Sequence, residues 1–333
     1  EVGDPYTLPG DRVAALYRDR SGLLWIGTWT GGLALFDADS EQIRVIQSSI
    51  GLPANAVSSL AALDNGDLMV GMVDRGGVAQ LAADGALIRQ FNTHSQPVPL
   101  AADDVTALLQ EARGLWVGYR RGGLDLLRSE GGIWRIGNMP ASPVQALKLD
   151  NGGSLWIGLL GGGVYSVCAA CQEPQAWPAD PNGQSGPLGS AINAIVQTRD
   201  GVLWFAVRRG GVSWLDPRSK QWGSLSATTP LALAHESVTS LLEDAQGHLW
   251  VGTQGGGLSL IERDANGIPT QIKIYSEAQG LVSSMVSAIV DGGDELWIST
   301  SRGLCRFFVE KEEFDCLNDR DPALAADFFV GAA

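Results

Sequence analysis

Six arginines occupy a set of equivalent short segments, and their guanidinium groups are well suited to binding chemistry. Each arginine lies in a turn that also contains one or two glycines. Guanidinium forks match carboxylate or sulfate oxygens, and aromatic faces match sugar rings. The segments therefore predict a binding surface for an anionic ligand, for example an acidic oligosaccharide. Its candidate residues are Trp29, Arg75, Tyr119, Arg120, Arg121, Arg208, Arg209 and Arg302.

A structural interpretation of the same arginines stands beside this one. The loops that lead into neighbouring repeats contain acids that could pair with them, namely Asp11, Asp103, Asp104 and Glu236. The two interpretations are compatible, because an ion pair can position one arginine and leave its neighbour free.

Four cysteines form two pairs at spacings that suit β-hairpins. Cys168 and Cys171 flank a two-residue turn, and Cys305 and Cys316 flank a turn at residues 310–311. Both pairs can reach the Cα separation of about 4.4–6.8 Å that a disulfide requires. A redox CxxC motif lacks the βαβ context that it needs, and a four-cysteine metal site would require two distant repeats to meet. The spacing favours disulfides Cys168–Cys171 and Cys305–Cys316, which indicate an oxidising compartment such as the periplasm.

Linear signatures of catalysis are missing from the sequence. The three histidines, His94, His235 and His248, are scattered, and His248 fits a solvated turn. No HExxH, P-loop, GxSxG or zinc-type cysteine spacing occurs. We expect no catalytic residues, no metal and no cofactor. A propeller lyase or glycosidase with two carboxylates from different repeats is an alternative that leaves no linear signature.

Seven internal repeats must position these residues. Each has a bulky anchor within a segment such as LWIG, and the period of about 45 residues matches a four-stranded propeller blade. The anchors are Trp25, Met69, Trp116, Trp156, Trp204, Trp250 and Trp297.

Each repeat is predicted to form four short antiparallel strands, and blade 7 to take its outer strand from residues near 313–318. A small residue follows each anchor by two positions, which we attribute to the space that a bulky ring of a stacked sheet needs. The predicted fold is all-β, a seven-bladed β-propeller over residues 1–320, followed by a tail or the start of another repeat at 321–333. The predicted blades cover residues 1–50, 51–97, 98–139, 140–186, 187–232, 233–279 and 280–320.

Composition limits the classes of partner. The 333 residues carry a formal net charge of −14, with 45% hydrophobic residues. A duplex-binding module normally has a basic face and a high pI, so nucleic acid is not an expected partner. No stretch approaches 18 apolar residues, and we expect any leader or membrane anchor to have been removed.

The repeat pattern V-x-x-[LI]-x-x-D-x-x-G-x-LW[IV]GT-x-x-GGL resembles that of the two-component regulator propeller family. LWIGT at 24–28 and LWVGT at 249–253 match it closely, whereas Met69 and Arg302 depart from it. The resemblance implies the periplasmic sensing part of a bacterial hybrid histidine kinase or of a membrane-bound diguanylate cyclase. Tandem propellers are common in that family, so it also implies that the chain is one propeller of a longer receptor.

The sequence thus favours a non-enzymatic extracytoplasmic sensor domain that binds a small molecule or an oligosaccharide. Its expected partners are that ligand, the remainder of a membrane-anchored receptor and a second copy in a homodimeric parent. The first alternative is a protein–protein interaction scaffold, because propeller faces serve as docking surfaces. The propeller lyase or glycosidase is the second.

Overall fold

A computed structural model describes residues 13–318 except 39, 41, 169, 170, 172, 265 and 266. The chain divides into two compact units, residues 1–144 with 318–332 and residues 145–317 with 333. Each unit is built from β-strands. Two single-turn 3-10 helices also occur in the described part, η1 (Ser48–Ile50) and η2 (Glu277–Gln279).

The first unit contains three sheets of four strands. In chain order the strands are β1 (Val13–Arg18), β2 (Leu24–Thr28), β3 (Gly32–Asp37), β4 (Gln42–Ile46), β5 (Val57–Ala62), β6 (Leu68–Met72), β7 (Gly77–Leu81), β8 (Leu87–Phe91), β9 (Val105–Glu111), β10 (Gly114–Tyr119), β11 (Leu124–Arg128) and β12 (Ile133–Ile136).

The second unit contains the other four sheets, apart from the border residues Val144 and Asn318. Their strands are β13 (Val144–Leu149), β14 (Leu155–Leu159), β15 (Gly163–Val167), β16 (Gln175–Trp177), β17 (Ile192–Gln197), β18 (Leu203–Val207), β19 (Gly211–Asp216), β20 (Gln221–Leu225), β21 (Val238–Glu243), β22 (Leu249–Thr253), β23 (Leu258–Arg263), β24 (Pro269–Tyr275), β25 (Val286–Asp291), β26 (Glu295–Thr300), β27 (Gly303–Phe308) and β28 (Glu313–Asn318).

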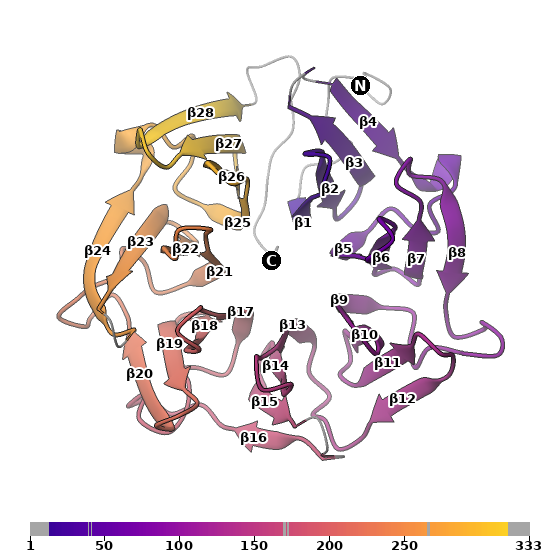
Figure 1. Cartoon of the computed structure of the whole chain (residues 1–333), viewed down its shortest axis with the longest axis horizontal. Helices are drawn as coiled ribbons and strands as arrows, with labels where there is room; N and C mark the ends of the chain where they lie inside the picture. Colours follow the sequence, from indigo (N-terminus) through magenta and orange to yellow (C-terminus); the bar gives the residue numbers. More distant parts are fainter. Residues whose placement is uncertain are drawn as a thin grey trace. The chain divides into compact units, whose positions relative to one another are not determined.

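Each sheet is a meander whose four strands pair in chain order (Figure 1). The fold is a seven-bladed β-propeller with four antiparallel strands per blade, which confirms the fold predicted from the repeats. All strands lie inside the predicted blade ranges, and the outer strand of blade 7, β28, lies where it was predicted. That residues 1–320 form one domain stays a prediction, and residues 321–333 lie outside the described part.

The second strand of each blade forms the core because both of its faces are covered. All five residues of β2, β6, β14, β18 and β22 are buried. A strand that is buried on both faces needs apolar residues without alternation, as in the LWIG segments. In the second unit, Trp204 packs against Leu249 and Val251 of the following blade. In the first unit, Trp25 packs against Leu68 and Val70 in the same way.

Successive blades within a unit meet closely at their first strands. A Cβ added to Gly27 would lie 2.5 Å from a methyl carbon of Val57, which begins β5. At Gly252 the same change would place a Cβ 2.7 Å from a methyl carbon of Val286, which begins β25. At these two positions the glycine that follows the anchor therefore makes room for a β-branched side chain of the next blade. Our expectation that it makes room for a bulky ring is wrong.

Polar side chains at the second position of the first strand also join neighbouring blades. The Ser58 hydroxyl donates to the carbonyl of Val105 at 2.7 Å. In the second unit, the Thr239 hydroxyl donates to the carbonyl of Val286 at 2.7 Å. These bonds satisfy buried groups and set the register between adjacent sheets.

Candidate functional site

The turn between the second and third strands lies beside the loop that leads into the same blade. The backbone N–H of Arg208 donates to the carbonyl of Ala191 at 2.8 Å. The glycine that begins the third strand then reaches the next blade, since Gly211 N–H donates to the carbonyl of Glu236 at 2.7 Å. The same pair of bonds occurs in blade 2, from Val73 and Gly77. These hydrogen bonds confirm that the arginine-bearing turns share one end of their blades with the loops leading into the first strands.

In the first unit, Asp104 joins two of these turns. Its side chain accepts a hydrogen bond from the backbone N–H of Arg75 at 3.2 Å, and its carbonyl accepts one from the N–H of Arg120 at 3.0 Å. The backbones of both arginines are therefore anchored to the same residue. Their side chains start from neighbouring points on this end of blades 2 and 3.

The six turn arginines are exposed, and none has a carboxylate within 4.0 Å in the described part of the chain. Of the acids proposed as their partners, Asp103, Asp104 and Glu236 form no ion pair with these guanidinium groups in the described part of the chain. Asp103 accepts hydrogen bonds from the backbone and hydroxyl of Thr93, at 2.6 and 2.9 Å. Asp11 lies outside the described residues. Within the described residues, these guanidinium groups are therefore not paired with an acid.

Two of the turn arginines have a backbone conformation that favours glycine. Arg75 has φ 63° and Arg209 has φ 61°. A residue with a Cβ is disfavoured in this left-handed region by about 1–2 kcal/mol. The same conformation occurs at Lys220 and Glu312 in outer hairpins, so it belongs to the geometry of tight turns.

The two aromatic residues of the predicted surface differ from each other. Trp29 is half-buried and remains a candidate for stacking. Tyr119 is only 1% exposed, so the prediction that it offers a stacking face is wrong. The reason is a shift of one position along the chain. Tyr119 is the last residue of β10 and does not belong to the turn. The residue of blade 3 that corresponds to Trp29 is Arg120.

Tyr119 instead completes a buried polar group in blade 3. Its hydroxyl donates to Asp125 at 2.7 Å, and Arg135 binds the same carboxylate through Nε and Nη2 at 2.7 and 3.0 Å. Burial, and next the negative charge of Asp125, raise the pKa of the Tyr119 hydroxyl well above its usual value. This group is structural, because every partner of the carboxylate comes from the fold itself.

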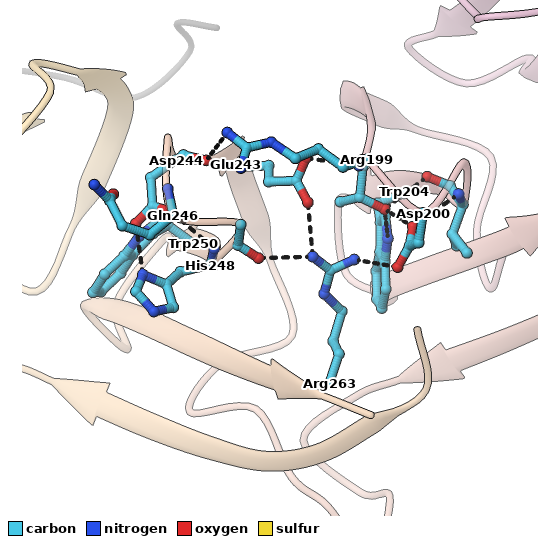
Figure 2. A network of polar contacts seen from close by, with 12 residues as sticks. Arg199, Asp200, Trp204, Glu243, Asp244, Gln246, His248, Trp250 and Arg263 are labelled. Carbon is cyan, nitrogen blue, oxygen red and sulfur yellow. Dashed lines mark hydrogen bonds and ion pairs between the residues drawn. The ribbon is translucent and has the colours of Figure 1, made fainter. Parts of the chain in front are cut away.

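The opposite end of the second strands carries a different kind of arginine site (Figure 2). Arg263 ends β23 and is directed into the interface between blades 5 and 6, where its guanidinium donates to Asp200 at 2.9 Å and to Glu243 at 2.8 Å. A third bond goes to the carbonyl of Gly247 at 2.9 Å, and the guanidinium lies 5.8 Å from the Trp204 ring centroid. With a side chain only 10% exposed, Arg263 is fully engaged in holding the two blades together.

A tryptophan–carboxylate hydrogen bond recurs at that end of the blades. The indole N–H donates to the acid six positions earlier, at 2.9 Å for Trp25 and Asp19 and at 2.8 Å for Trp250 and Asp244. Burial alone would raise the pKa of Asp244, but hydrogen bonds from Trp250 and from His248 outweigh it and hold that pKa below its usual value. This contact with the anchor was not predicted from the sequence, although the recurring interval of six residues between acid and tryptophan is a signal for it.

Blade 2 breaks this pattern at both positions. Met69 replaces the tryptophan, and the residue six positions before it is Leu63, which is one residue earlier than the acid Asp64. A cavity of about 480 Å³ lies beside Met69, between blades 2 and 3. Met69 stands out in the sequence as a departure from the repeat, and the loss of a large side chain at a buried position is a signal for a cavity.

Both cysteine pairs form disulfides in the structure, Cys168–Cys171 and Cys305–Cys316. Their Cα atoms are 5.0 and 4.0 Å apart. The second disulfide links β27 to the outer strand β28 of blade 7. Each therefore joins the two sides of a single hairpin.

The described residues contain no metal-type cluster of side chains. No group of three or more His, Cys, Asp or Glu side chains within residues 13–318 is placed to hold a metal ion. The ring nitrogen Nδ1 of His248 lies 2.9 Å from Asp244, so this histidine belongs to the tryptophan–carboxylate site. The described part also contains no helix long and apolar enough to cross a membrane.

The family model called two component regulator propeller matches two segments of the chain, residues 7–30 and 232–255. These segments contain the second strands of blades 1 and 6, which carry LWIGT and LWVGT. No curated protein matches the sequence.

Solved structures share the fold at low sequence identity. The extracellular domain of BT3049 of B. thetaiotaomicron, assigned to a hybrid two component system, has a TM-score of 0.64 at 18% identity and covers 98% of this chain. The extracellular domain of BT4673 of the same organism, assigned to a one component system, has a TM-score of 0.56 at 17% identity and covers 92%. This chain spans about half of each, 54% and 48%.

An enzyme shares the fold as well. Virginiamycin B lyase from Staphylococcus aureus has a TM-score of 0.64 at 16% identity, covering 87% of this chain and 92% of its own. At these identities the likeness shows the propeller fold and carries no activity with it.

Proposed function

Because this chain carries repeats of the two component regulator propeller family, we propose that it is a sensor domain of a bacterial signalling receptor. In this proposal the domain is extracytoplasmic, in the periplasm, and has no catalytic activity of its own. It binds an anionic ligand, for example an acidic oligosaccharide, through the arginine-bearing turns. The two disulfides support the assignment to an oxidising compartment.

The observation that carries the proposal is a set of free cations on an acidic protein. The chain has a net charge of −14, yet Arg75, Arg120 and Arg121 of the first unit are exposed without a described acidic partner. Arg208, Arg209 and Arg302 of the second unit are in the same state. Charge-assisted bonds to an acidic ligand contribute about 1.5–3 kcal/mol each, which gives both affinity and selectivity against neutral ligands.

Ligand occupancy would reach the membrane by a shift of population. A ligand that binds one arrangement of a receptor dimer more tightly moves the equilibrium toward that arrangement, by at most its difference in affinity. The remainder of the parent receptor, with a histidine kinase or diguanylate cyclase output, would respond to that shift. The propeller needs no reacting group for this role.

The test is a calorimetric titration with oligogalacturonate and with a neutral galactan oligosaccharide of the same length. We expect the acidic oligosaccharide to bind and the neutral one to bind at least tenfold more weakly. The variants Arg75→Gln/Arg120→Gln and Arg208→Gln/Arg209→Gln remove the charge and retain a polar side chain. At least one of these pairs should weaken acidic binding by tenfold or more.

Arg218→Gln is the matched control, because Arg218 is also exposed but pairs with Asp216 at 3.2 Å in an outer hairpin. It should leave binding unchanged. Equal binding of the two oligosaccharides, or normal acidic binding by both double variants, would contradict the proposal. Absence of binding by both oligosaccharides would also count against it and favour a protein-docking surface.

A further inference from the structure

The cavity beside Met69 lies entirely within the first unit, in the interface between blades 2 and 3. Its volume is about 480 Å³, within the range of about 300–1,000 Å³ that is typical of small-molecule sites. An apolar floor is provided by Leu63, Met69, Phe91, Val98, Leu115 and Leu127. The cavity is therefore large and apolar enough to accept the body of a small molecule.

The preceding interface shows what a tryptophan does at this position. Between blades 1 and 2, where Trp25 takes the place of Met69, the corresponding cavity is about 250 Å³. Trp25 also uses its N–H to bind Asp19, whereas Met69 and Leu63 offer no such bond. Met69 and Leu63 stand where the repeat has a tryptophan and an acid. Their side chains leave open the space that the tryptophan and the acid fill in blade 1.

The cavity also lacks the guanidinium group that fills the equivalent interface in the second unit. Ser129 lies five residues after the start of β11, the position at which β23 carries Arg263. Asn65 and Gln110 stand where blades 5 and 6 carry the two carboxylates that bind Arg263, and all three residues line the cavity. At these three positions the interface between blades 2 and 3 thus lacks the two acids and the buried cation of the interface between blades 5 and 6.

The charges around the cavity favour an anion. Arg89 and Arg128 both line it, and the Arg89 guanidinium is held over the Phe91 ring at 4.6 Å from its centroid. The pair between Arg128 and Glu130 is 3.9 Å long with both side chains exposed, so it competes only weakly for the guanidinium. The acid that lines the cavity, Asp64, is exposed.

We propose that this cavity binds a small amphipathic anion, with an aromatic or branched apolar body and one carboxylate. The body would lie on the apolar floor near Met69, and the carboxylate would bind Arg89 and Arg128. The site is separate from the arginine-bearing turns, because Asp64 and Asn65 precede β6 and the turn with Arg75 follows it. A receptor with both sites would respond to two chemically different ligands.

Three probes that share one phenyl ring and one three-carbon chain test the proposal: 3-phenylpropionate, 3-phenylpropanol and 3-phenylpropylamine. Titrations of the full chain should show the carboxylate binding about tenfold more tightly than the alcohol, and the amine most weakly. The variant Arg89→Gln/Arg128→Gln should abolish the preference for the carboxylate and leave the affinity for the alcohol unchanged.

Met69→Trp should abolish binding of all three probes, because the indole would occupy the cavity. Met72→Leu is its control, a volume-conserving change in the same strand whose side chain does not line the cavity. If Met69→Trp does not fold, the arginine double variant still decides the question. Equal affinity for the three probes, no binding by the wild type, or unchanged binding by Met69→Trp would overturn the proposal.

Discussion

The arginines at the two ends of β18 differ in whether they bind acidic residues. At one end, Arg199 uses its N–H and guanidinium to bind Glu243 and the Asp244 carbonyl, next to the buried contacts of Arg263. At the other end, Arg208 and Arg209 are exposed and have no described acidic partner. Both ends belong to the same repeat, so the repeat alone does not determine whether an arginine is paired with an acid.

The difference lies in the acids that surround each end. The Arg263 end receives Asp200 and Glu243 from blades 5 and 6, which compensate the cost of burying a charge. The turn end receives backbone carbonyls, such as those of Ala191 and Glu236, which bind backbone N–H groups and leave the guanidinium groups free. Arginines at the Arg263 end thus have structural roles, whereas Arg208 and Arg209 at the turn end are exposed without a described acidic partner.

Replacement of Arg263 by alanine should have the largest effect on stability. It leaves Asp200 and Glu243 without their cation, and removal of one partner from a buried pair costs about 3–5 kcal/mol. Chemical denaturation of Arg263→Ala should show this loss in the free energy of unfolding. Arg208→Ala, at the other end of the comparison, should stay within about 0.5 kcal/mol of the wild type. Equal losses in both variants would contradict the comparison.

Trp204→Met should reproduce the blade 2 anchor in blade 5. The free energy of unfolding should fall by about 2–4 kcal/mol, because the ring that contacts Arg263 and the following blade is removed. A crystal structure of the variant should show a new cavity beside Arg263. A loss below about 1 kcal/mol would mean that the interface repacks and that the cavity beside Met69 has another cause.

Asp244 should make the Arg263 end sensitive to acid. Its pKa is below the usual value in the folded chain, so its carboxylate adds stability above the unfolded pKa of about 3.9, and this stability is lost as the pH falls through the folded pKa. Asp244→Asn should lower the free energy of unfolding by about 1–3 kcal/mol at pH 7 and flatten its decrease below pH 4. An unchanged acid profile would show that Asp244 does not contribute to this decrease.

The smallest effect should come from Arg209→Gly. Because Arg209 has φ 61°, glycine relieves the backbone, and the free energy of unfolding should rise by up to about 1 kcal/mol. Arg208→Gly lacks this relief and should be neutral or destabilising by about 0.5–1 kcal/mol. If Arg209→Gly is the more destabilising variant, Arg209 has a structural role that its exposed position does not show.

The sequence predicted the features that follow from the spacing of its residues. Trp25 and its equivalents recur at a nearly constant interval, which is enough to predict seven blades of four strands. The interval between Cys305 and Cys316 likewise predicts opposite positions in a hairpin. Both features can be recognised from the intervals between residues along the chain.

The sequence did not predict what depends on burial or on contacts between blades. Tyr119 lies next to an exposed turn in sequence, but a single step along β10 places it in the core with Asp125. Arg263 meets Asp200 across 63 positions, and no linear spacing signals that contact. The cavity beside Met69 likewise requires knowledge of which residues of the next blade face it.

The most direct test of the account follows the arginine side-chain Nε–H signals by NMR during a titration with oligogalacturonate. Signals assigned by substitution to Arg208 and Arg209 should shift and saturate, while that of Arg263 should stay in place because its partners are already within the fold. Loss of the shifts at high salt would support charge recognition. Turn arginines that do not respond, or an Arg263 signal that shifts as much as theirs, would contradict the assignment of binding to the turn end.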